Sequence, residues 1–283
     1  MKILLTTLVS LFTLAGLYAQ DAASVYTYTF GGAEISLLQE GARDSNPDVL
    51  VGASAEIINR YATNGALPGA TNAFVARING KTVLIDSGFG TKLFENLRSL
   101  GIEPEAVDIV LLTHLHGDHI GGMLKDGRIM FPKAEVYVSK PEYDYWANGT
   151  NAGAKAFLEA YKGQLRLFDP TGFDSAPFRV APGVDAFAAF GHTPGHTVYL
   201  LEDGGARVLV IGDVINVAAV QFSRPDIAAV YDVDPAEASR TKVKVLEYAA
   251  ANRIPVAGMH LSFPGIGQVT GNGEGGFDFK PVR

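Results

Sequence analysis

Short apolar runs in this sequence repeatedly end in histidine or aspartate, and this pattern constrains the fold more than any other feature. Four such runs lead into polar groups: Asp108–Thr113 before His114, His116, Asp118 and His119, Val184–Phe190 before His192 and His196, VLVIG before Asp213, and Ile254–Gly258 before His260. All six histidines of the chain lie at such ends. A single histidine there is more often structural, but the complete set favours a shared site. Since open α/β sheets place their sites beyond the carboxyl ends of strands, we expect these side chains to meet at one sheet edge.

Strand-like and helix-like segments alternate along the chain. The strand candidates are apolar runs bounded by Gly, Pro or Asp: Val25–Phe30, Phe74–Ile78, Thr82–Ile85, Asp108–Thr113, Glu135–Val138, Val184–Phe190, Thr197–Leu201 and Val208–Ile211. The helix candidates end at a glycine or begin with a capping box and a proline: Lys92–Leu100, a helix opened by Ser139, and one from Asp234 to about Ala251. This interleaving predicts a layered α/β fold. Gly41–Gly69 and Pro264–Gly276 are expected to be irregular, and loops this long often act as lids or mobile segments.

The composition excludes some classes of protein. The chain has 283 residues, 47% of them hydrophobic, which is enough to bury a large core. Its formal charge of −7 and pI near 5.4 argue against nucleic acid as a partner, because phosphate binding needs a basic surface. The lack of cysteine excludes disulfides and thiolate ligands. No repeat or linker divides the sequence, so we expect residues 20–283 to form one domain.

The first residues have the pattern of a signal peptide. One lysine is followed by an apolar stretch diluted by Thr, Ser and Gly, and a short exit of small residues precedes the polar sequence from Asp21. We expect residues 1–19 to be cleaved after Ala19 and the mature protein to be exported, in a bacterium to the periplasm, without membrane attachment. An uncleaved membrane anchor is the alternative, since Ile3–Ala19 is nearly long enough to span a bilayer.

The clustered side chains are chemically suited to hold a metal. Imidazole nitrogens and carboxylate oxygens bind borderline divalent cations such as zinc. A buried group of such side chains would be costly to desolvate without an ion. Manganese, cobalt and iron accept the same ligands, so the residues predict a divalent metal site, with zinc as the first expectation.

At this point the motifs carry a family resemblance. HLHGDH (114–119), GHTPGH (191–196), Gly212-Asp213 and the later His260 closely resemble the metallo-β-lactamase superfamily over essentially the whole mature chain. The resemblance implies an αββα sandwich of two mixed sheets with helices outside and metals at one edge. It also implies a binuclear centre, in which His114, His116 and His192 hold the first metal, Asp118, His119 and His260 the second, and Asp213 bridges both.

The resemblance further implies how the centre acts. A metal-bridging hydroxide would be the nucleophile, held by Asp213, and Asp118 near the leaving oxygen could deliver a proton. Asp86, in LIDSG, matches a family position that hydrogen-bonds a ligand histidine, although such an aspartate can also be a simple turn residue. His196 would support the site from outside the ligand set.

Departures from the family patterns narrow the subfamily. The β-lactamases of the superfamily lack the bridging aspartate, and glyoxalase II carries a helical domain where only a short segment follows His260 here. Persulfide dioxygenases keep a single iron and do not need seven ligands. Two hydrolase branches fit the remaining pattern: the quorum-quenching lactonases and the exported methyl parathion hydrolase-like enzymes. The second is favoured, because its members resemble segments 216–234 and 259–267 and the signal peptide. Well-known lactonases place a tyrosine where this chain has Asn216, so the group that orients a substrate carbonyl is left open.

We therefore predict a binuclear metal-dependent hydrolase of a small-molecule lactone or ester, with phosphotriester hydrolysis as a side activity. The alternatives are a main activity on organophosphates, a β-lactamase, or a non-catalytic periplasmic metal-binding protein. Phe89, Trp146, Asn216 and Phe222 are candidates for the pocket wall, since aromatic rings suit an acyl or aryl group, but rings at such positions are as often core residues. Arg224 is expected to form a surface salt bridge. A homodimer is left open.

Overall fold

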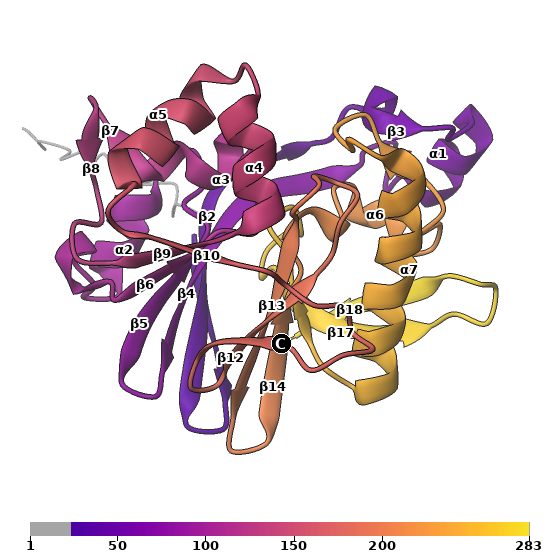
Figure 1. Cartoon of the computed structure of the whole chain (residues 1–283). Helices are drawn as coiled ribbons and strands as arrows, with labels where there is room; N and C mark the ends of the chain where they lie inside the picture. Colours follow the sequence, from indigo (N-terminus) through magenta and orange to yellow (C-terminus); the bar gives the residue numbers. More distant parts are fainter. Residues whose placement is uncertain (1–23, 283) are drawn as a thin grey trace, which may run out of the picture.

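Two mixed β-sheets pack face to face between outer helices (Figure 1). This computed structural model describes residues 24–282, so the predicted signal peptide, residues 1–19, lies outside the described residues. Within residues 24–282 no helix is both long and apolar enough to cross a bilayer. The arrangement is the αββα sandwich expected from the sequence motifs, and the predicted fold class is confirmed.

The first sheet has seven strands in the order β1-β2-β4-β5-β6-β9-β10. Its antiparallel part consists of β1 (Val25–Phe30), β2 (Ala33–Asp44), β4 (Pro68–Ile78) and β5 (Lys81–Ile85). The remaining strands run parallel to β5 and are β6 (Ile109–Leu111), β9 (Glu135–Ser139) and β10 (Leu165–Phe168). The carboxyl ends of these parallel strands therefore meet at one edge of the sheet.

The second sheet also has seven strands, in the order β11-β12-β13-β14-β16-β17-β18. They are β11 (Phe178–Ala181), β12 (Val184–Ala188), β13 (Thr197–Asp203), β14 (Ala206–Val210), β16 (Val256–Ala257), β17 (Ile266–Gly271) and β18 (Phe277–Pro281). All neighbours are antiparallel except β14 and β16, whose carboxyl ends point the same way. Two small sheets pair β3 (Leu50–Val51) with β15 (Ala228–Ala229) and β7 (Leu124–Lys125) with β8 (Arg128–Ile129).

Helices cover the outer faces of both sheets. They are α1 (Ala55–Tyr61), α2 (Leu93–Ser99), α3 (Gly117–Ile120), α4 (Lys140–Asn148), α5 (Ala152–Tyr161), α6 (Ala218–Gln221) and α7 (Pro235–Asn252), with 3-10 turns η1 (Pro47–Val49), η2 (Pro104–Ala106), η3 (Gly121–Met123) and η4 (Gly212–Val214). Figure 1 shows α2, α4 and α5 outside the first sheet and α7 outside the second. As predicted, Ser139 and Asp234 cap α4 and α7, because their side chains accept the N–H of the residue three positions later.

Neighbouring residues of the central strands face different cores. In β4, Phe74 packs between the sheets, whereas Val75 packs with the residues of α2 and α5. In β14, Val210 faces the space between the sheets and Leu209 packs with the apolar residues of α7. Strands that are buried on both faces are continuous apolar runs in the sequence, so they could be predicted from it.

Two predicted loops are wrong. Gly41–Gly69 contains the end of β2, η1, β3, α1 and the start of β4, and Pro264–Gly276 contains β17. The first stretch was misjudged because its strand ends are polar and exposed, so they lack an apolar run. The second was misjudged because its strand is rich in glycine, and glycine usually marks a break in a strand.

Candidate metal centre and adjoining pocket

The polar groups that follow four strands meet at one edge of the sandwich. The turn after β6 and the short α3 carry His114, His116, Asp118 and His119, the turn between β12 and β13 carries His192 and His196, and Asp213 and His260 follow β14 and β16. Two hydrogen bonds tie the sheets together here: the Tyr199 hydroxyl donates to the Leu112 carbonyl at 2.8 Å, and the Thr197 N–H donates to the Thr113 carbonyl at 2.9 Å. The two sheets thus bring their ligand-bearing turns into contact.

Three histidines form a compact trio. The Nδ1 atom of His116 lies 2.9 Å from Nε2 of His114 and 3.0 Å from Nε2 of His192, and the latter two atoms are 3.2 Å apart. Nitrogens on a tetrahedral zinc ion, with bonds of about 2.0–2.1 Å, lie about 3.3 Å apart. The trio therefore has nearly the spacing that a metal requires.

Hydrogen bonds at Nδ1 orient two rings of this trio, those of His114 and His192. The Nδ1–H of His192 donates to Asp232 at 2.8 Å, and Nδ1 of His114 lies 3.1 Å from the Thr113 hydroxyl, which itself donates to Asp86. The neutral rings then direct two Nε2 lone pairs at one another. Such a contact is repulsive without a proton or a cation between the atoms, so the site fits a metal ion.

A second trio consists of Asp118, His119 and His260, whose ligand atoms also lie close enough to share an ion. An Asp118 oxygen is 3.7 Å from Nε2 of His119 and 3.6 Å from Nε2 of His260. The Nδ1–H of His119 donates to Asp86 at 2.7 Å, and that of His260 donates to the Ala70 carbonyl at 2.8 Å. Both rings therefore present Nε2 to the site.

Asp213 lies between the two trios. Its Oδ2 atom is 3.3 Å from Nε2 of His192 and 3.0 Å from Nε2 of His260, while Oδ1 is 3.1 Å from Nε2 of His119. Within residues 24–282, neither that Oδ1 nor that Nε2 has a hydrogen-bond partner, although both are buried. Buried polar atoms without partners are rare in folded proteins, and a metal shared with both would satisfy them.

The two trios differ in how strongly they bind protons. Burial and the nearby His192 lower the pKa of His116 to about 4, and burial and His119 hold the pKa of His114 well below its usual value. Burial also acts to lower the pKa of His260, but Asp213 beside it wins and raises that pKa to about 8. Near neutral pH His114 and His116 are therefore free to receive a cation, whereas His260 holds a proton until a cation replaces it.

Two further predicted residues touch the centre. His196 is buried, its Nε2 accepts the N–H of Asp213 at 3.0 Å, and burial with His192 lowers its pKa to about 3. Asn216 donates from Nδ2 to Oδ2 of Asp213 at 3.0 Å. Both side chains fix the aspartate between the trios, one through its backbone and one through its carboxylate.

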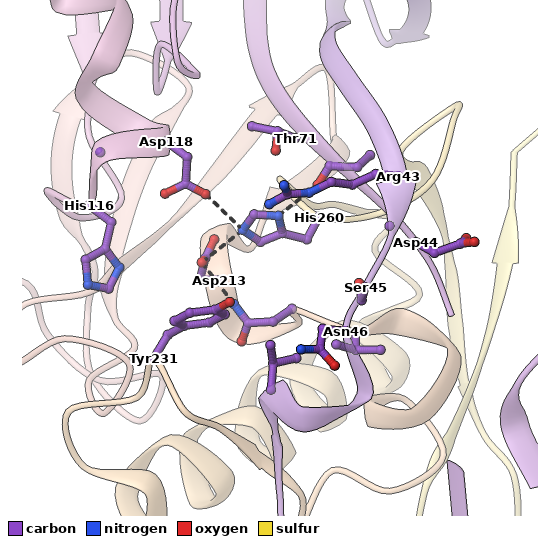
Figure 2. A pocket seen from close by; sticks show the side chains of 16 residues that line it. Arg43, Asp44, Ser45, Asn46, Thr71, His116, Asp118, Asp213, Tyr231 and His260 are labelled. Atoms are coloured by element: carbon purple, nitrogen blue, oxygen red, sulfur yellow. Dashed lines mark hydrogen bonds and ion pairs between the residues drawn. The ribbon is translucent and has the colours of Figure 1, made fainter. Parts of the chain in front are cut away.

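A cavity of about 480 Å³ opens beside both trios (Figure 2). The trios contribute His116, Asp118 and His260 to its wall, and Asp213 and Asn216 line it as well. The end of β2, the turn that follows it and the start of β4 form another wall, and one tyrosine from a distant segment completes the lining: Arg43, Asp44, Ser45, Asn46, Val49, Gly69, Ala70, Thr71 and Tyr231. Its volume lies in the range of small-molecule sites.

A model of the metallo-beta-lactamase superfamily matches residues 66–255, a segment that contains every residue of the two trios except His260. The chain belongs to the metallo-beta-lactamase superfamily.

Other superfamily members resemble the chain over very different lengths. The solved structure of the hydrolase AbOPH is 30% identical, covers 93% of this chain and 99% of its own, and has a TM-score of 0.84. AidC, a dizinc quorum-quenching lactonase, is 23% identical, covers 92% and 98%, and has a TM-score of 0.81. The N-acyl homoserine lactonase AiiB of Agrobacterium fabrum is 31% identical over 36% of this chain and 37% of its own. The chain spans less than two thirds of the curated relatives that it matches, from 14% to 63% of their length.

The aromatic residues that we predicted for the pocket wall lie elsewhere in this metallo-beta-lactamase fold. Phe222 is wrong as a wall residue, because it is 3% exposed and stacks on Phe279 in the core under α7. Phe89 is 52% exposed and outside the lining. Trp146 is buried and packs edge-on against His116 rather than lining the cavity. Arg224 pairs with Asp226 at the surface, as expected.

The fold of this superfamily member brings several further residues to the candidate metal centre that the sequence did not single out. Asp232 fixes the ring of His192, and Glu142 accepts hydrogen bonds from both ligand-bearing turns. Arg43 and Tyr231 line the cavity. Only the proline-containing capping box of α4 pointed toward Glu142, and nothing local distinguished Asp232 from other acidic residues of its segment.

Proposed function

We propose that this superfamily member is a binuclear metal-dependent hydrolase whose main substrate is a small lactone or ester. One observation carries the proposal: side chains of both trios and Asp213 line a single cavity of about 480 Å³ that is large enough for a small molecule. A metal store would enclose its ions with protein ligands, and catalytic sites instead keep a position open to substrate. The cavity therefore favours catalysis over the non-catalytic alternative.

The ligand set supports two divalent ions, with zinc as the first expectation. His114, His116 and His192 would hold one ion, Asp118, His119 and His260 the other, and Asp213 would contact both. Bound there, the ions would generate a nucleophile from water near neutral pH and polarise the electrophilic oxygen of the substrate.

The side chains of the chain would supply the remaining steps. Asp118 has a side chain that is 24% exposed and lines the cavity, so its carboxylate can take a proton from the attacking water and pass it to the leaving oxygen. Asp213 is held in place by Asn216 and His196. Arg43 and Tyr231 on the other walls offer a guanidinium and a hydroxyl to bind the polar part of a substrate. Figure 2 shows Asp118, Asp213, Arg43 and Tyr231 around one pocket.

The comparisons favour a lactone or ester over a β-lactam. The partial match to the lactonase AiiB is 31% identical, and AbOPH, which matches over almost its whole length, is a hydrolase. A centre that stabilises attack on a carbonyl also suits displacement at phosphorus, so we propose phosphotriester hydrolysis as a side activity.

A substrate panel tests the proposal. Zinc- and manganese-loaded mature protein would be given a long-chain homoserine lactone, an aryl ester, a dimethyl phosphotriester and a cephalosporin, with chelator-treated protein as the control. We expect the highest kcat/KM for the lactone or the ester and no turnover after metal removal. Preferred cleavage of the phosphotriester or the cephalosporin would overturn the substrate assignment. No turnover of any member by the two-metal protein would favour a metal-binding protein instead.

A further inference from the structure

A buried carboxylate outside the ligand set connects the two turns that carry the first trio. This residue is Glu142, which lies in the first turn of α4 and is 1% exposed. It accepts hydrogen bonds from the N–H of Leu115 at 2.9 Å, Nε1 of Trp146 at 2.5 Å, the hydroxyl of Thr193 at 2.6 Å and the N–H of Gly195 at 3.1 Å. Each carboxylate oxygen thus accepts two hydrogen bonds, which satisfies all the lone pairs of the group.

The donors occupy particular places in the sequence. Leu115 lies between two ligands, His114 and His116, while Thr193 and Gly195 lie between His192 and His196. One carboxylate therefore holds both backbone segments that present the first trio. The turn of His192 also contacts α4 directly, since a Cβ atom on Gly195 would lie 2.0 Å from the backbone nitrogen of Glu142.

The tryptophan donor adds control over one ligand. Within the described residues, the other four histidines of the two trios each pair their second ring nitrogen with a protein oxygen, but Nε2 of His116 has no such bond. The ring of His116 instead packs edge-on against Trp146, at 5.4 Å between ring centroids and an interplanar angle of 84°. Glu142 fixes this tryptophan through its indole N–H, so it acts on the ligand that has no orienting partner of its own.

Helix capping does not explain this arrangement. In a capping box the glutamate side chain returns to the N–H of the capping residue, whereas here the carboxylate of Glu142 turns to the ligand turns and Ser139 caps α4 through its hydroxyl. Burying a carboxylate is costly unless it is hydrogen-bonded, and an apolar residue would serve packing alone. The Ser139 hydroxyl also donates to the Gly195 carbonyl at 2.6 Å, which fastens the same turn to the start of α4.

We propose that Glu142 is a positioning residue that sets the geometry of the first metal site by holding the turns of His114, His116 and His192 in register. The inference rests on the proposed metal-dependent function, but it concerns metal binding and can be tested without a substrate. Glu142 does not touch the substrate cavity, so its effect reaches the reaction only through the ligands.

The decisive variant is Glu142→Gln, which keeps the shape of the side chain but turns one acceptor oxygen into a donor facing two donors. Asp144→Asn is the matched control, because Asp144 lies on the same helix, is exposed and, among residues 24–282, uses its side chain to pair with Lys140 alone. Thr193→Val is a milder variant that removes one donor, and it replaces Glu142→Gln if that protein fails to fold.

Three readouts separate positioning from packing: cobalt affinity by chelator competition, the visible absorption spectrum of the cobalt-loaded protein, and kcat and KM. We expect Glu142→Gln to weaken binding at the first site by about 10- to 100-fold, to shift the cobalt spectrum and to lower kcat more than it raises KM. Thr193→Val should show a smaller change of the same kind, and Asp144→Asn none.

Wild-type cobalt affinity and spectrum in Glu142→Gln, with only a lower melting temperature, would overturn the inference and leave Glu142 a structural residue. The same holds for Thr193→Val if it is the variant that folds. If the wild-type protein binds two metals and hydrolyses no substrate, the proposed function fails, while the cobalt comparison still decides the role of Glu142.

Discussion

The ligands of the centre and the residues that orient them come from different parts of the chain. His114, His116, Asp118 and His119 lie within six positions, so the turn after β6 and the short α3 present all four together. Asp86, which fixes the ring of His119, is 33 positions away from it. Asp232 is 40 positions from His192, and only the path of the chain around α6 and β15 places the two 2.8 Å apart.

Replacing the aspartate between the trios tests the ligand assignment. Asp213→Asn keeps the size of the side chain but removes the charge that contacts His119, His192 and His260. We expect the bound metal to fall from two ions to one per chain and kcat/KM to fall by more than about 100-fold, with the fold retained. Metal analysis after desalting, with circular dichroism as the folding control, would measure this. Two tightly bound ions in an active variant would contradict the assignment.

The pKa values of the histidines predict how metal binding depends on pH. In the metal-free protein Asp213 raises the pKa of His260 to about 8 against burial, so a proton competes with the second ion below that pH. Asp213 and Asp118 also hold the pKa of His119 well above its usual value against burial, so its proton competes with the same ion. Burial and His192 lower the pKa of His116 to about 4, so a proton on His116 does not compete with the first ion in this range. Between pH 8.5 and 6.5 we expect the affinity for the second ion to fall by at least roughly 25-fold. Calorimetric zinc titrations at the two pH values would show it, and an equal loss at both sites would refute it.

The raised pKa of His260 also makes the stability of the metal-free protein depend on pH. The folded-state pKa of His260 is higher than the ordinary value of 6.5, so this group contributes stability that is complete below about pH 6.5 and is lost as the pH rises through about 8. Metal binding reverses the preference, because the ion takes the place of the proton.

Secondary-structure elements of the sandwich were identified from the sequence where they are apolar on both faces. β5, β6 and β14 are short, largely buried runs, and the N-cap residues Ser139 and Asp234 marked the starts of α4 and α7. β2 was missed although it is one of the longest strands, because its second half is polar and exposed, and its buried half shows no alternation. The polar end of that strand is the part that lines the cavity.

The turn between β12 and β13 predicts a sharp effect of one methyl group. In Gly195→Ala the new Cβ would lie 2.0 Å from a backbone nitrogen of α4, which cannot move aside as a side chain could. We expect the free energy of unfolding to fall by about 1–3 kcal/mol and the affinity for the first metal to fall with it. Gly163→Ala is the control, since nothing lies within 4 Å of its Cβ, and it should stay within about 0.5 kcal/mol. Denaturant unfolding of the two variants would measure this difference. Equal free energies of unfolding would show that the turn can move to accommodate the methyl group.

The wall built from the end of β2 predicts a change in substrate binding alone. Arg43→Ala removes a guanidinium from the cavity and leaves the trios untouched, so kcat/KM should fall about tenfold, mostly through KM, with two metals still bound. Arg60→Ala is the control, because Arg60 on α1 pairs with Glu274 outside the cavity. Equal kinetics for both variants would exclude Arg43 from the substrate site.

At the scale of the whole molecule, the ligands of the centre are divided between the two sheets. The first sheet supplies the ligands after β6, and the second supplies those after β12, β14 and β16, so the centre exists only when the sheets are packed. The sequence could predict this architecture through its motifs, since the motif order fixes which strands carry ligands. It could not predict the pocket walls, because Arg43 and Tyr231 come from segments with no motif, and only long-range packing brings them beside the centre.

The central claim is that hydrolysis needs both ions, and a stepwise metal titration of activity tests it most directly. Metal-free protein would receive zinc in increments from zero to three equivalents, with the initial rate on the best lactone or ester of the panel measured at each step at pH 8.5. We expect a low rate up to one equivalent, a steep rise between one and two, and a plateau beyond two. Full activity at one equivalent, or in protein without metal, would contradict the requirement for both ions.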